Sequence, residues 1–559
     1  MNRIKKYLCL LLVLLFGVSV LCPAVSAFDS GKTYYVDSID GSDSGDGLSK
    51  ETAWKTLGPA ISMGLFLEAG DSILFRKGGT YECAVTVSYN GTKDSPVVFS
   101  SYGEGDKPVL WTNERKEVFQ FIDCSYITVS DIAITAPNGG GIWIDTINKT
   151  SEGITLDNIY FYGIQNYKVN SRDNLSAGAA AARAAVMVKG LPARSRYAVN
   201  DLTIKNCEIY DCANGISLWG SWNDEQAPWC ENEEDIDPVF NTGVLVENCY
   251  FHEMDAEAII VGICDGALVT NCRAINCCQG EGVDENGEIL YFTAAMWFWG
   301  SVNSTIQYCE IAGQKNVGDG MAVDFDSYSH NCTYQYIYSH DNVRFMCNCP
   351  NYSGQHGNTV RYCLSVNDNG GRSRMAGSAG EYGFSFYNNT IINCGEFQMQ
   401  YIHDSFVANN IIIPMEGAVV SYDLFQLGEN NVFTNNCYYD VMTPLVDIGS
   451  LNTVPGFSGG DFTDRLSFEL SGDSPLIGAG VKVDDDLEYD FFGNKITSNN
   501  IGCYGGNGTD AEYESESFFT KILRTVNDIM TVLRHEFDVI KEEIEELIDK
   551  RKQDTVVNA

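Results

Sequence analysis

Apolar and polar residues alternate in short runs through the middle of the chain. The segment Asp201–Tyr210 shows the pattern, because the polar residue Thr203 separates Leu202 from Ile204. A period of two residues is typical of β-strands with one buried face. Helices would need apolar residues three and four positions apart, and these runs lack that spacing. The middle of the chain is therefore predicted to be all-β.

The runs also recur along the chain, each marked by an asparagine or tyrosine that often precedes cysteine. The later copies follow one another at intervals of about 21 to 28 residues. A repeat of this length built from strands predicts a solenoid, here a parallel β-helix whose coils stack about 4.8 Å apart. The copies are Asn206-Cys207, Asn248-Cys249, Asn271-Cys272, Tyr308-Cys309, Tyr336-Ile337, Tyr362-Cys363, Asn389-Thr390, Asn409-Asn410 and Asn436-Cys437.

The repeat position predicts the state of the cysteines. Cysteines at one position of successive coils should form an inward row of small apolar side chains. Their side-chain directions would not suit disulfides, so most of them are expected to be free thiols in the core. The row comprises Cys207, Cys249, Cys272, Cys309 and Cys363.

Four regions are expected along the chain. Residues 1–27 have a basic start, an apolar stretch and a small-residue cleavage pattern at Val25-Ser26-Ala27, which predicts a signal peptide and a secreted, extracellular protein. Residues 28–115 should form an N-terminal cap with a short helix near Pro59, followed by the first coils. Residues 116–507 should form the β-helix, closed by terminal strands at 474–477 and 501–504. A solenoid needs a cap to cover its open end.

The fourth region, 508–559, differs in kind. Its apolar residues fall three or four apart, which predicts an amphipathic helix of coiled-coil character. The helix could lie back on the solenoid or serve self-association. The apolar positions are Ile522, Val526, Ile529, Leu533, Phe537, Ile540, Ile544 and Leu547.

The formal net charge of −39 restricts the partners. Nucleic acid and anionic membranes attract basic surfaces, so neither is an expected partner after signal cleavage. A neutral or cation-bridged polymer fits better, although solubility outside the cell explains much of the charge.

Several segments together resemble the pectate lyase-like superfamily of secreted right-handed parallel β-helix proteins. The resemblance covers about residues 30–507, is specific for fold, and implies action on, or binding to, an acidic or neutral polysaccharide. Residues 318–326 and 339–342 are similar to β-helix glycoside hydrolases. The segments that carry the superfamily resemblance are 34–37, 41–47, 53–57, 69–73, 79–81, 95–97, 474–480 and 501–505.

Aligning the coils by their own pattern predicts one outward face. If Leu218, Phe298, Phe325 and Met399 point inward, their neighbours in the strands must point outward to solvent. Aromatic rings offer apolar area to sugars, and carboxylates and amides bind hydroxyl groups. The face predicted to bind substrate and carry out the chemistry consists of Trp219, Trp297, Trp299, Asp324, Asp326, Gln398 and Gln400.

Glycoside hydrolysis needs two carboxyl groups, one as proton donor and one as base or nucleophile. Asp324 and Asp326 are expected to supply them, since their Cα atoms would lie about 6.5–7 Å apart on one strand. Asp341 is predicted as a third catalytic carboxylate. Asp368 is predicted as a substrate contact, although aspartates at such turns more often cap the backbone. His340 and Arg344 are expected to orient the substrate.

Two other functions stay open. A calcium-dependent polysaccharide lyase would use a Lys or Arg base, with Asp319 as a possible calcium ligand. A noncatalytic carbohydrate-binding surface protein would bind without turnover. The residues favour a glycoside hydrolase, with no certain cofactor and a polysaccharide or oligosaccharide as partner.

Overall fold

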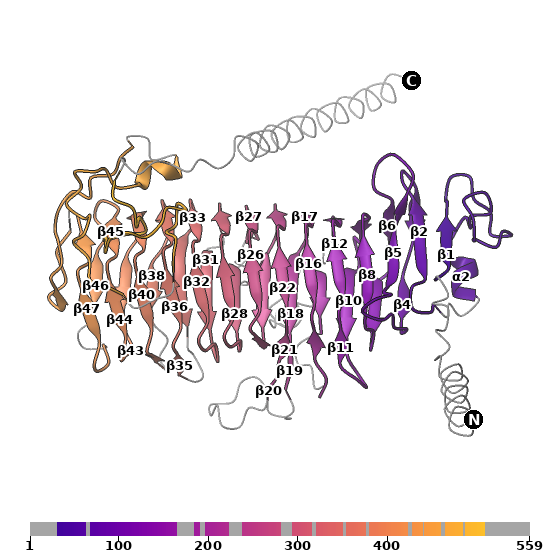
Figure 1. Ribbon diagram of the computed structural model, residues 1–559, viewed down its shortest axis with the longest axis horizontal. Coiled ribbons are helices and arrows are strands. Elements are labelled where there is room, and N and C mark those ends of the chain that lie inside the picture. The colour runs from indigo at the N-terminus through magenta and orange to yellow at the C-terminus, as the bar shows by residue number, and fades with distance from the viewer. Residues whose placement is uncertain are drawn as a thin grey trace, which may run out of the picture. The chain divides into compact units, whose positions relative to one another are not determined.

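The computed structural model describes most of the chain between residues 31 and 508, and that part is built almost entirely of strands and turns (Figure 1). The described residues up to Gly506 form one compact unit. The predicted signal peptide, the C-terminal helix and Asp319 lie outside the described residues. Within the described ranges, no helix is long and apolar enough to cross a bilayer. The ranges are 31–62, 67–164, 184–189, 196–222, 238–280, 293–315, 320–349, 354–375, 380–422, 427–439, 441–459, 464–483 and 487–508.

Three long parallel sheets, named A, B and C here, run along the coil stack. Sheet A contains β1 (Thr33–Val36), β2 (Ser72–Arg76), β5 (Val97–Tyr102), β8 (Ile127–Ser130), β12 (Thr155–Asp157), β16 (Thr203–Lys205), β22 (Leu245–Glu247), β26 (Leu268–Thr270), β29 (Thr305–Gln307), β32 (Thr333–Gln335), β36 (Thr359–Arg361), β40 (Ser385–Tyr387), β44 (Phe406–Ala408), β47 (Val432–Thr434) and β49 (Asp447–Ile448). Sheet B contains β3 (Thr80–Glu82), β6 (Val109–Trp111), β9 (Ala133–Thr135), β13 (Tyr160–Tyr162), β17 (Glu208–Tyr210), β23 (Tyr250–His252), β27 (Arg273–Ile275), β30 (Glu310–Ala312), β33 (Tyr338–His340), β37 (Leu364–Val366), β41 (Thr390–Cys394), β45 (Ile411–Pro414) and β48 (Cys437–Tyr438).

Sheet C is the sheet that carries the predicted site. Its strands are β4 (Val85–Val87), β7 (Glu117–Ile122), β10 (Gly140–Asp145), β14 (Ala184–Val188), β18 (Asn214–Trp219), β24 (Ile259–Gly262), β28 (Ala294–Trp299), β31 (Met321–Asp326), β34 (Arg344–Cys349), β38 (Ser373–Met375), β42 (Phe397–Met399) and β46 (Val420–Tyr422).

Short elements complete the described part. They are the helices α2 (Gly58–Ser62) and η3 (Arg465–Phe468), and the small pairings of β11 (Ser151–Glu152) with β15 (Val199–Asn200), β19 (Ser221–Trp222) with β20 (Pro238–Val239), β21 (Asn241–Thr242) with β25 (Cys264–Asp265), and β35 (Gln355–His356) with β39 (Glu381–Tyr382) and β43 (Ile402–His403).

Each coil visits sheets A, B and C in turn, as β26, β27 and β28 do, before the next coil begins with β29. Each strand pairs in parallel with the corresponding strand of the next coil. This topology confirms the predicted right-handed parallel β-helix. The short helix predicted near Pro59 is confirmed as α2.

The recurring asparagine makes the turn from sheet A to sheet B. Asn206, Asn248 and Asn271 each have a φ of +54°. Asparagine adopts this left-handed conformation more readily than most residues, so a single residue can bend the chain between two strands. Tyrosines occupy the same position in later coils, with Tyr308 at +52°. The repeat motif is therefore a corner of the coil.

The cysteine that follows this corner points into the core. All five cysteines of the predicted row are buried and free, which confirms the prediction. In the last coils asparagines replace them. The side chain of Asn389 donates to that of Asn410 at 3.0 Å, and Asn410 donates to Asn436 at 2.8 Å. Buried amides need such partners, and the ladder supplies one for each successive coil.

The C-terminal part of the described chain packs on the outside of the last coils. Tyr336, Tyr362 and Tyr387 form a small apolar cluster against Leu487 and Phe491, among others. The residues 474–477 and 501–504 are turns, so the prediction of terminal strands there is wrong. Proline has no N–H to donate to a sheet, and the φ of +97° at Gly502 is incompatible with a strand.

A buried carboxyl group lies inside the coil at β39. Glu381 is 2% exposed and accepts hydrogen bonds from the side-chain amides of Asn348, at 3.1 Å, and Asn358, at 3.3 Å. Burial raises the pKa of Glu381 to about 8, and the two amides offset only part of this effect.

This pKa predicts a pH-dependent stability. Between pH 4.5 and about 8 the folded chain keeps a proton that the unfolded chain has lost. Stability should therefore fall as pH rises through this window, by up to about 1.4 kcal/mol per pH unit. Glu381→Gln should remove most of this slope and stabilise the protein at pH 8. Urea unfolding at pH 5, 6.5 and 8 measures how the free energy of unfolding changes with pH.

The exposed Glu416→Gln is the control for a change of charge alone. Asp490, whose pKa burial raises to about 6, leaves a smaller slope at the acidic end of the window in every variant. An unchanged slope in Glu381→Gln would contradict the assignment of the buried proton.

Candidate functional site

Sheet C places a tryptophan and an aspartate side by side. β28 and β31 pair with Trp297 opposite Asp324 and with Phe298 opposite Phe325. Both phenylalanines are fully buried in the core. Because strand residues alternate between faces, Trp297, Asp324 and, two residues further, Asp326 belong to the outer face of the sheet. The predicted alignment of these coils is confirmed.

The same register extends the outer face along the coil stack. Trp219 is opposite Gly262, which in turn is opposite Trp299. In the other direction, Asp324 is opposite Cys347 of β34, and Cys347 is opposite Arg374 of β38. Arg374 is in turn opposite Gln398 of β42. The register therefore places the predicted tryptophans, the aspartates and Gln398 along one sheet.

The outer face is not open to solvent as the sequence predicted. Trp219 is 1% exposed, Trp299 is 3% exposed and Trp297 is 9% exposed. Asp324 is 7% exposed. The expectation of bare tryptophans and carboxylates in water is therefore wrong, although these residues lie outside the coil's own core.

The outward side chains pack against one another. Trp219 meets Trp299 edge to face at 5.5 Å and Trp297 at 6.5 Å, and Trp299 meets Tyr328 at 5.9 Å. Such geometries are favourable for aromatic pairs. They belong to a second apolar cluster, which comprises Ala184, Met187, Trp219, Ile260, Ile263, Ala294, Trp297, Trp299, Met321, Tyr328 and Cys347.

Several buried hydrogen-bond donors in or near this cluster have no partner among the described residues. They are the indole Nε1–H groups of Trp143, Trp219 and Trp297 and the hydroxyl of Ser217. Buried polar groups are usually paired, and an unpaired one costs about 1–3 kcal/mol. An indole N–H can only donate. The face is therefore suited to a ligand with apolar surface and acceptor oxygens.

A core tyrosine supports the strand that carries the aspartates. The hydroxyl of Tyr334, fully buried inside the coil, donates to the backbone oxygen of Asp324 at 2.5 Å. The carboxylate of Asp326 accepts from the backbone N–H of Ser327 at 2.7 Å. The pair is thus held by groups on both sides of the sheet.

The remaining residues predicted on this face lie toward the C-terminal coils. Arg344 is the first residue of β34 and lies opposite Met321, which precedes Asp324 by three residues. The side-chain nitrogen of Gln398 donates to Gln400 at 3.1 Å. Arg344 and the two glutamines therefore extend the face beyond the aspartates.

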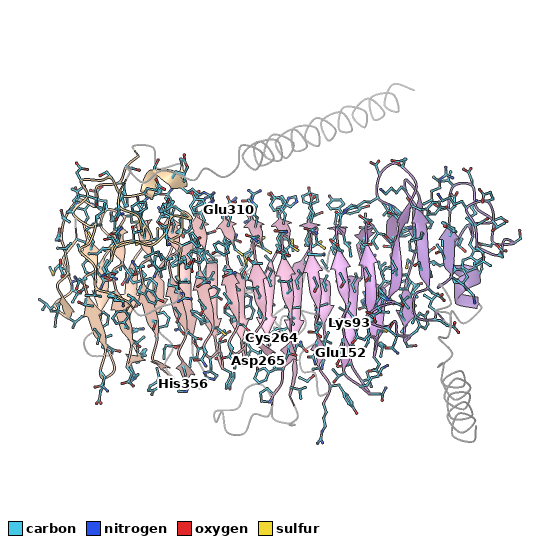
Figure 2. The ribbon with its side chains drawn as sticks, viewed as in Figure 1. Lys93, Glu152, Cys264, Asp265, Glu310 and His356 are labelled. Carbon is cyan, nitrogen blue, oxygen red and sulfur yellow. The ribbon has the colours of Figure 1, made fainter. Side chains whose placement is uncertain are left out.

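His340 and Asp341 lie elsewhere, at the end of sheet B. His340 contacts Asp341 at 2.8 Å and Glu310 at 3.4 Å, and Glu310 also accepts from Arg273 at 2.8 Å. Burial disfavours the charged imidazole, but these two carboxylates outweigh it and raise the pKa of His340. Burial likewise opposes ionisation of Glu310, yet His340 and Arg273 lower its pKa to about 2. Figure 2 labels Glu310, which belongs to β30 of sheet B.

Asp368 is not available to a substrate. It is fully buried and accepts hydrogen bonds from Ser339 at 2.5 Å, Ser365 at 2.7 Å and the backbone of Asn342 at 2.9 Å. The predicted substrate contact is therefore wrong. The carboxylate fixes the turn between sheets B and C, as aspartates in turns commonly do.

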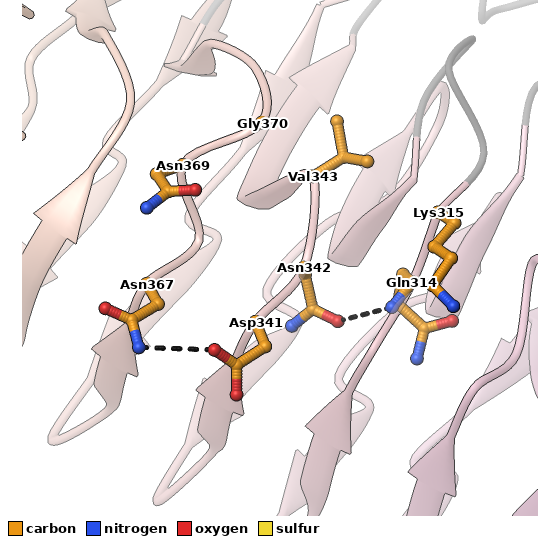
Figure 3. A pocket seen from close by; sticks show the side chains of 8 residues that line it. All are labelled: Gln314, Lys315, Asp341, Asn342, Val343, Asn367, Asn369 and Gly370. Carbon is orange, nitrogen blue, oxygen red and sulfur yellow. Dashed lines mark hydrogen bonds between the residues drawn. The ribbon is translucent and has the colours of Figure 1, made fainter. Parts of the chain in front are cut away.

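A cavity of about 430 Å³ lies over these turns, which lead into β34 and β38 (Figure 3). Asn367 donates to Asp341 at 3.2 Å, and Asn342 accepts from the backbone of Gln314 at 3.0 Å. Asp341 therefore faces this cavity, on the edge of sheet C. The lining residues are Gln314, Lys315, Asp341, Asn342, Val343, Asn367, Asn369 and Gly370.

Among the described residues, no three His, Cys, Asp or Glu side chains gather closely enough to hold a metal ion. The possible calcium ligand Asp319 falls outside these residues. Calcium therefore stays a prediction.

Sequence reasoning missed several polar residues on the face. Asn214 is the first residue of β18, and the backbone N–H of Gly215 donates to the backbone oxygen of Glu257 in the next coil. Asn214 and Glu257 therefore precede the position of Trp219 in their coils. Arg374 lies opposite Gln398. The repeat markers of their coils lie several residues earlier and do not fix these positions, since Glu257 lies outside a regular strand and Arg374 follows a Gly-rich turn. Only the register reveals them.

No protein-family model matches the chain, and no curated protein matches it. Solved structures do. The lacto-N-biosidase of family GH136 from Eubacterium ramulus superposes with a TM-score of 0.51 at 18% identity, covering 76% of this chain and 68% of the enzyme. XylC, solved in complex with xylose, gives 0.50 at 12% identity, covering 85% and 98%. Pectate lyase Pel9A gives 0.40 at 14% identity, covering 86% and 98%.

At these identities the likeness to the first two structures shows the fold. It agrees with the sheet topology, so the chain has the parallel β-helix architecture that its sequence resembles. Chemistry does not follow from fold, because one fold hosts many reactions.

Gly262, which lies between Trp219 and Trp299 in the register, provides a test of the face. A Cβ atom at Gly262 would lie 2.4 Å from the ring of Trp219 and 2.8 Å from the backbone of Leu218. Gly262→Ala should therefore displace the indole and cost about 1–3 kcal/mol of stability. Gly472→Ala is the control, because nothing lies within 4 Å of that position. Thermal unfolding and tryptophan fluorescence report both effects, and equal behaviour of the two variants would contradict this packing.

Proposed function

We propose that the protein is a secreted glycoside hydrolase that cleaves an oligosaccharide or polysaccharide on the outer face of sheet C. The observation that carries the proposal is the pairing of Trp297 with Asp324, two residues from Asp326, on a shielded outer face. Two solved β-helix structures of similar fold, a lacto-N-biosidase and XylC in complex with xylose, support a sugar as the ligand.

The chemistry follows from what the face offers. Asp324 and Asp326 are two residues apart on β31, a Cα separation of about 6.5–7 Å. This range allows side-chain spacings for both retaining and inverting hydrolysis, depending on rotamer. One carboxyl protonates the glycosidic oxygen, and the other acts as nucleophile or activates water. The aromatic wall excludes water and presents its indole N–H groups to sugar oxygens.

Asp341 takes a smaller part in this proposal. It faces the cavity at the edge of sheet C and pairs with His340, so it can bind a substrate hydroxyl there. Among the arginines that could serve as the base of a lyase, Arg361 lies on sheet A, where it donates to Gln335 at 2.8 Å and Tyr387 at 2.9 Å. Arg344 is the candidate base on the same face as Asp324.

Asp324→Asn and Asp326→Asn should each reduce kcat/KM by about 10²–10⁴-fold, because each removes a group that transfers a proton or attacks the sugar. A reducing-end assay on glycans found by array screening measures this. Asp94→Asn, in an exposed loop, is the control. Circular dichroism should show an unchanged fold in all three variants.

Full activity in both sheet C variants would reject the site. Product absorbance near about 235 nm that requires calcium would select a lyase, since that reaction creates a double bond by proton abstraction. Binding without any turnover would select a carbohydrate-binding surface protein.

We also propose that residues 508–559 mediate self-association, since their apolar spacing is that of a coiled coil. Removing residues 512–559 should reduce the number of protomers per particle, which is the mass from sedimentation equilibrium divided by the calculated mass of one chain, and leave glycan cleavage unchanged. The same number of protomers for the full and truncated chains would reject this role.

A further inference from the structure

One amide interrupts the apolar inner row of sheet C. Phe298 of β28 is opposite Phe325 of β31, and Phe325 is opposite Asn348 of β34. All three side chains are fully buried. In chain order the row is Phe121, Ile144, Val188, Leu218, Val261, Phe298, Phe325 and Asn348. A buried polar group costs free energy unless it is hydrogen-bonded, so Asn348 needs partners inside the coil.

Asn348 belongs to a buried hydrogen-bond network around Glu381. Its Nδ2 atom donates to Oε2 of Glu381 at 3.1 Å. The Nδ2 atom of Asn358 donates to the same oxygen at 3.3 Å and to Oε1 of Gln355 at 3.2 Å. None of these four side chains is more than 2% exposed. The network therefore lies wholly inside the coil.

The network reaches the strand that carries the two aspartates. Gln355 donates through Nε2 to the backbone oxygen of Phe325 at 3.3 Å. Phe325 lies between Asp324 and Asp326 in β31, and it is also the residue opposite Asn348. The network thus holds β31 directly through Gln355, and it holds the neighbouring strand through Asn348.

Two acceptor oxygens of this network have no hydrogen-bond donor among the described residues. They are Oε1 of Glu381 and Oδ1 of Asn348. An ionised carboxylate can only accept, so it cannot pair with an amide oxygen, whereas a protonated carboxyl group has one O–H donor. With a proton on Oε1, Glu381 can donate to Oδ1 while Asn348 donates to Oε2. One proton then satisfies both oxygens in a ring of two hydrogen bonds.

We propose that Glu381 is a positioning residue that keeps its proton at neutral pH, closes this ring with Asn348, and so fixes the strands that hold Asp324 and its neighbours in register. The ring itself requires no activity, but its effect on cleavage rests on the proposed function. Loss of the proton leaves a buried charge facing an amide oxygen, which loosens β34 against β31.

The surroundings of Glu381 support a neutral carboxyl group. Burial raises its pKa to about 8, and the two amides are the other groups that shift it. The thiol of Cys332 also interacts with it, but burial raises the pKa of this thiol to about 12, so the thiol stays neutral. His356, Tyr382 and His403 alternate with the buried row and stack on the outer side. The ring should therefore be closed below pH 8 and open as pH rises through this value.

Infrared spectroscopy of the full-length protein with isotope-labelled glutamate tests the proton. At pH 6.5 the carbonyl band of a protonated glutamic acid should be present, and it should disappear as pH rises through about 8. The band should be absent from Glu381→Gln. A wild-type spectrum without this band at pH 6.5, or a band that Glu381→Gln retains, would overturn the proposal.

Hydrogen exchange of peptides from β31 and β34, followed by mass spectrometry, tests the ring. In the wild type, protection corrected for the intrinsic exchange rate should fall at least about tenfold between pH 6.5 and 9, a change of about 1.4 kcal/mol. Glu381→Gln should keep full protection at both pH values, because its amide N–H replaces the acid O–H. Glu381→Met, which forms no ring, should show low protection at both.

The exposed Glu416→Gln should behave as the wild type, and peptides from β5 and β8 should be unaffected by pH in every variant. The wild type and Glu381→Gln decide the test if Glu381→Met does not fold. Wild-type protection that is equal at both pH values, or a loss in Glu381→Gln at pH 6.5, would contradict the ring.

Cleavage separates this proposal from the hydrolase. Between pH 7 and 9, kcat/KM of the wild type should fall at least about tenfold relative to Glu381→Gln, because small displacements of catalytic groups slow reactions strongly. Equal pH profiles of the two proteins would reject the positioning role. A protein that cleaves no glycan but shows the infrared and exchange results would reject the hydrolase and retain the ring.

Discussion

The parallel backbone ladder of sheet C is the constraint on which the site depends. Each strand places its residues directly beside the equivalent residues of the preceding strand, about 4.8 Å further along the stack. Trp297 and Asp324 are 27 positions apart in sequence, yet the ladder makes them neighbours. A shift of one residue would turn both side chains into the core, so the register that stabilises the coil also defines the face.

This face is unusual because it is apolar on both sides. The inner side packs Phe298 and Phe325 in the core, and the outer side packs Trp219, Trp297 and Trp299 in a second cluster. Sheets A and B mostly present partly exposed residues outward, in the alternation expected for a half-solvated strand. Shielding Asp324 within such a cluster strengthens its interactions, because electrostatic attraction grows as water is excluded. Burial therefore supports a chemical role more than open exposure would.

Much of the fold was predictable from the sequence, because each signal is local. Asn206 and Cys207 mark a corner and the inward residue after it, and they recur from coil to coil. The alternation of β28 and β31 was enough to align Trp297 with Asp324. Exposure was not predictable, since it depends on what packs over the outer face, and the sequence pattern reports only which way a side chain points.

The errors have the same origin. Asp368 has the sequence context of its neighbour Asp341, but only the structure shows that one is enclosed by serine hydroxyls and the other faces a cavity. The terminal strands failed because apolar residues at 474–477 and 501–504 pack without sheet partners. Arg374 carries no periodic signal, so its position opposite Gln398, two coils from Asp324, appears only once the coils are stacked.

The most direct test of the account is a crystal structure of Asp324→Asn with a bound oligosaccharide substrate. The account predicts a sugar ring against Trp297, with its glycosidic oxygen within hydrogen-bonding distance of residue 324 or 326 and its chain running along sheet C. A glycan bound on sheet A or sheet B, with the Trp297–Asp324 face unoccupied, would contradict it.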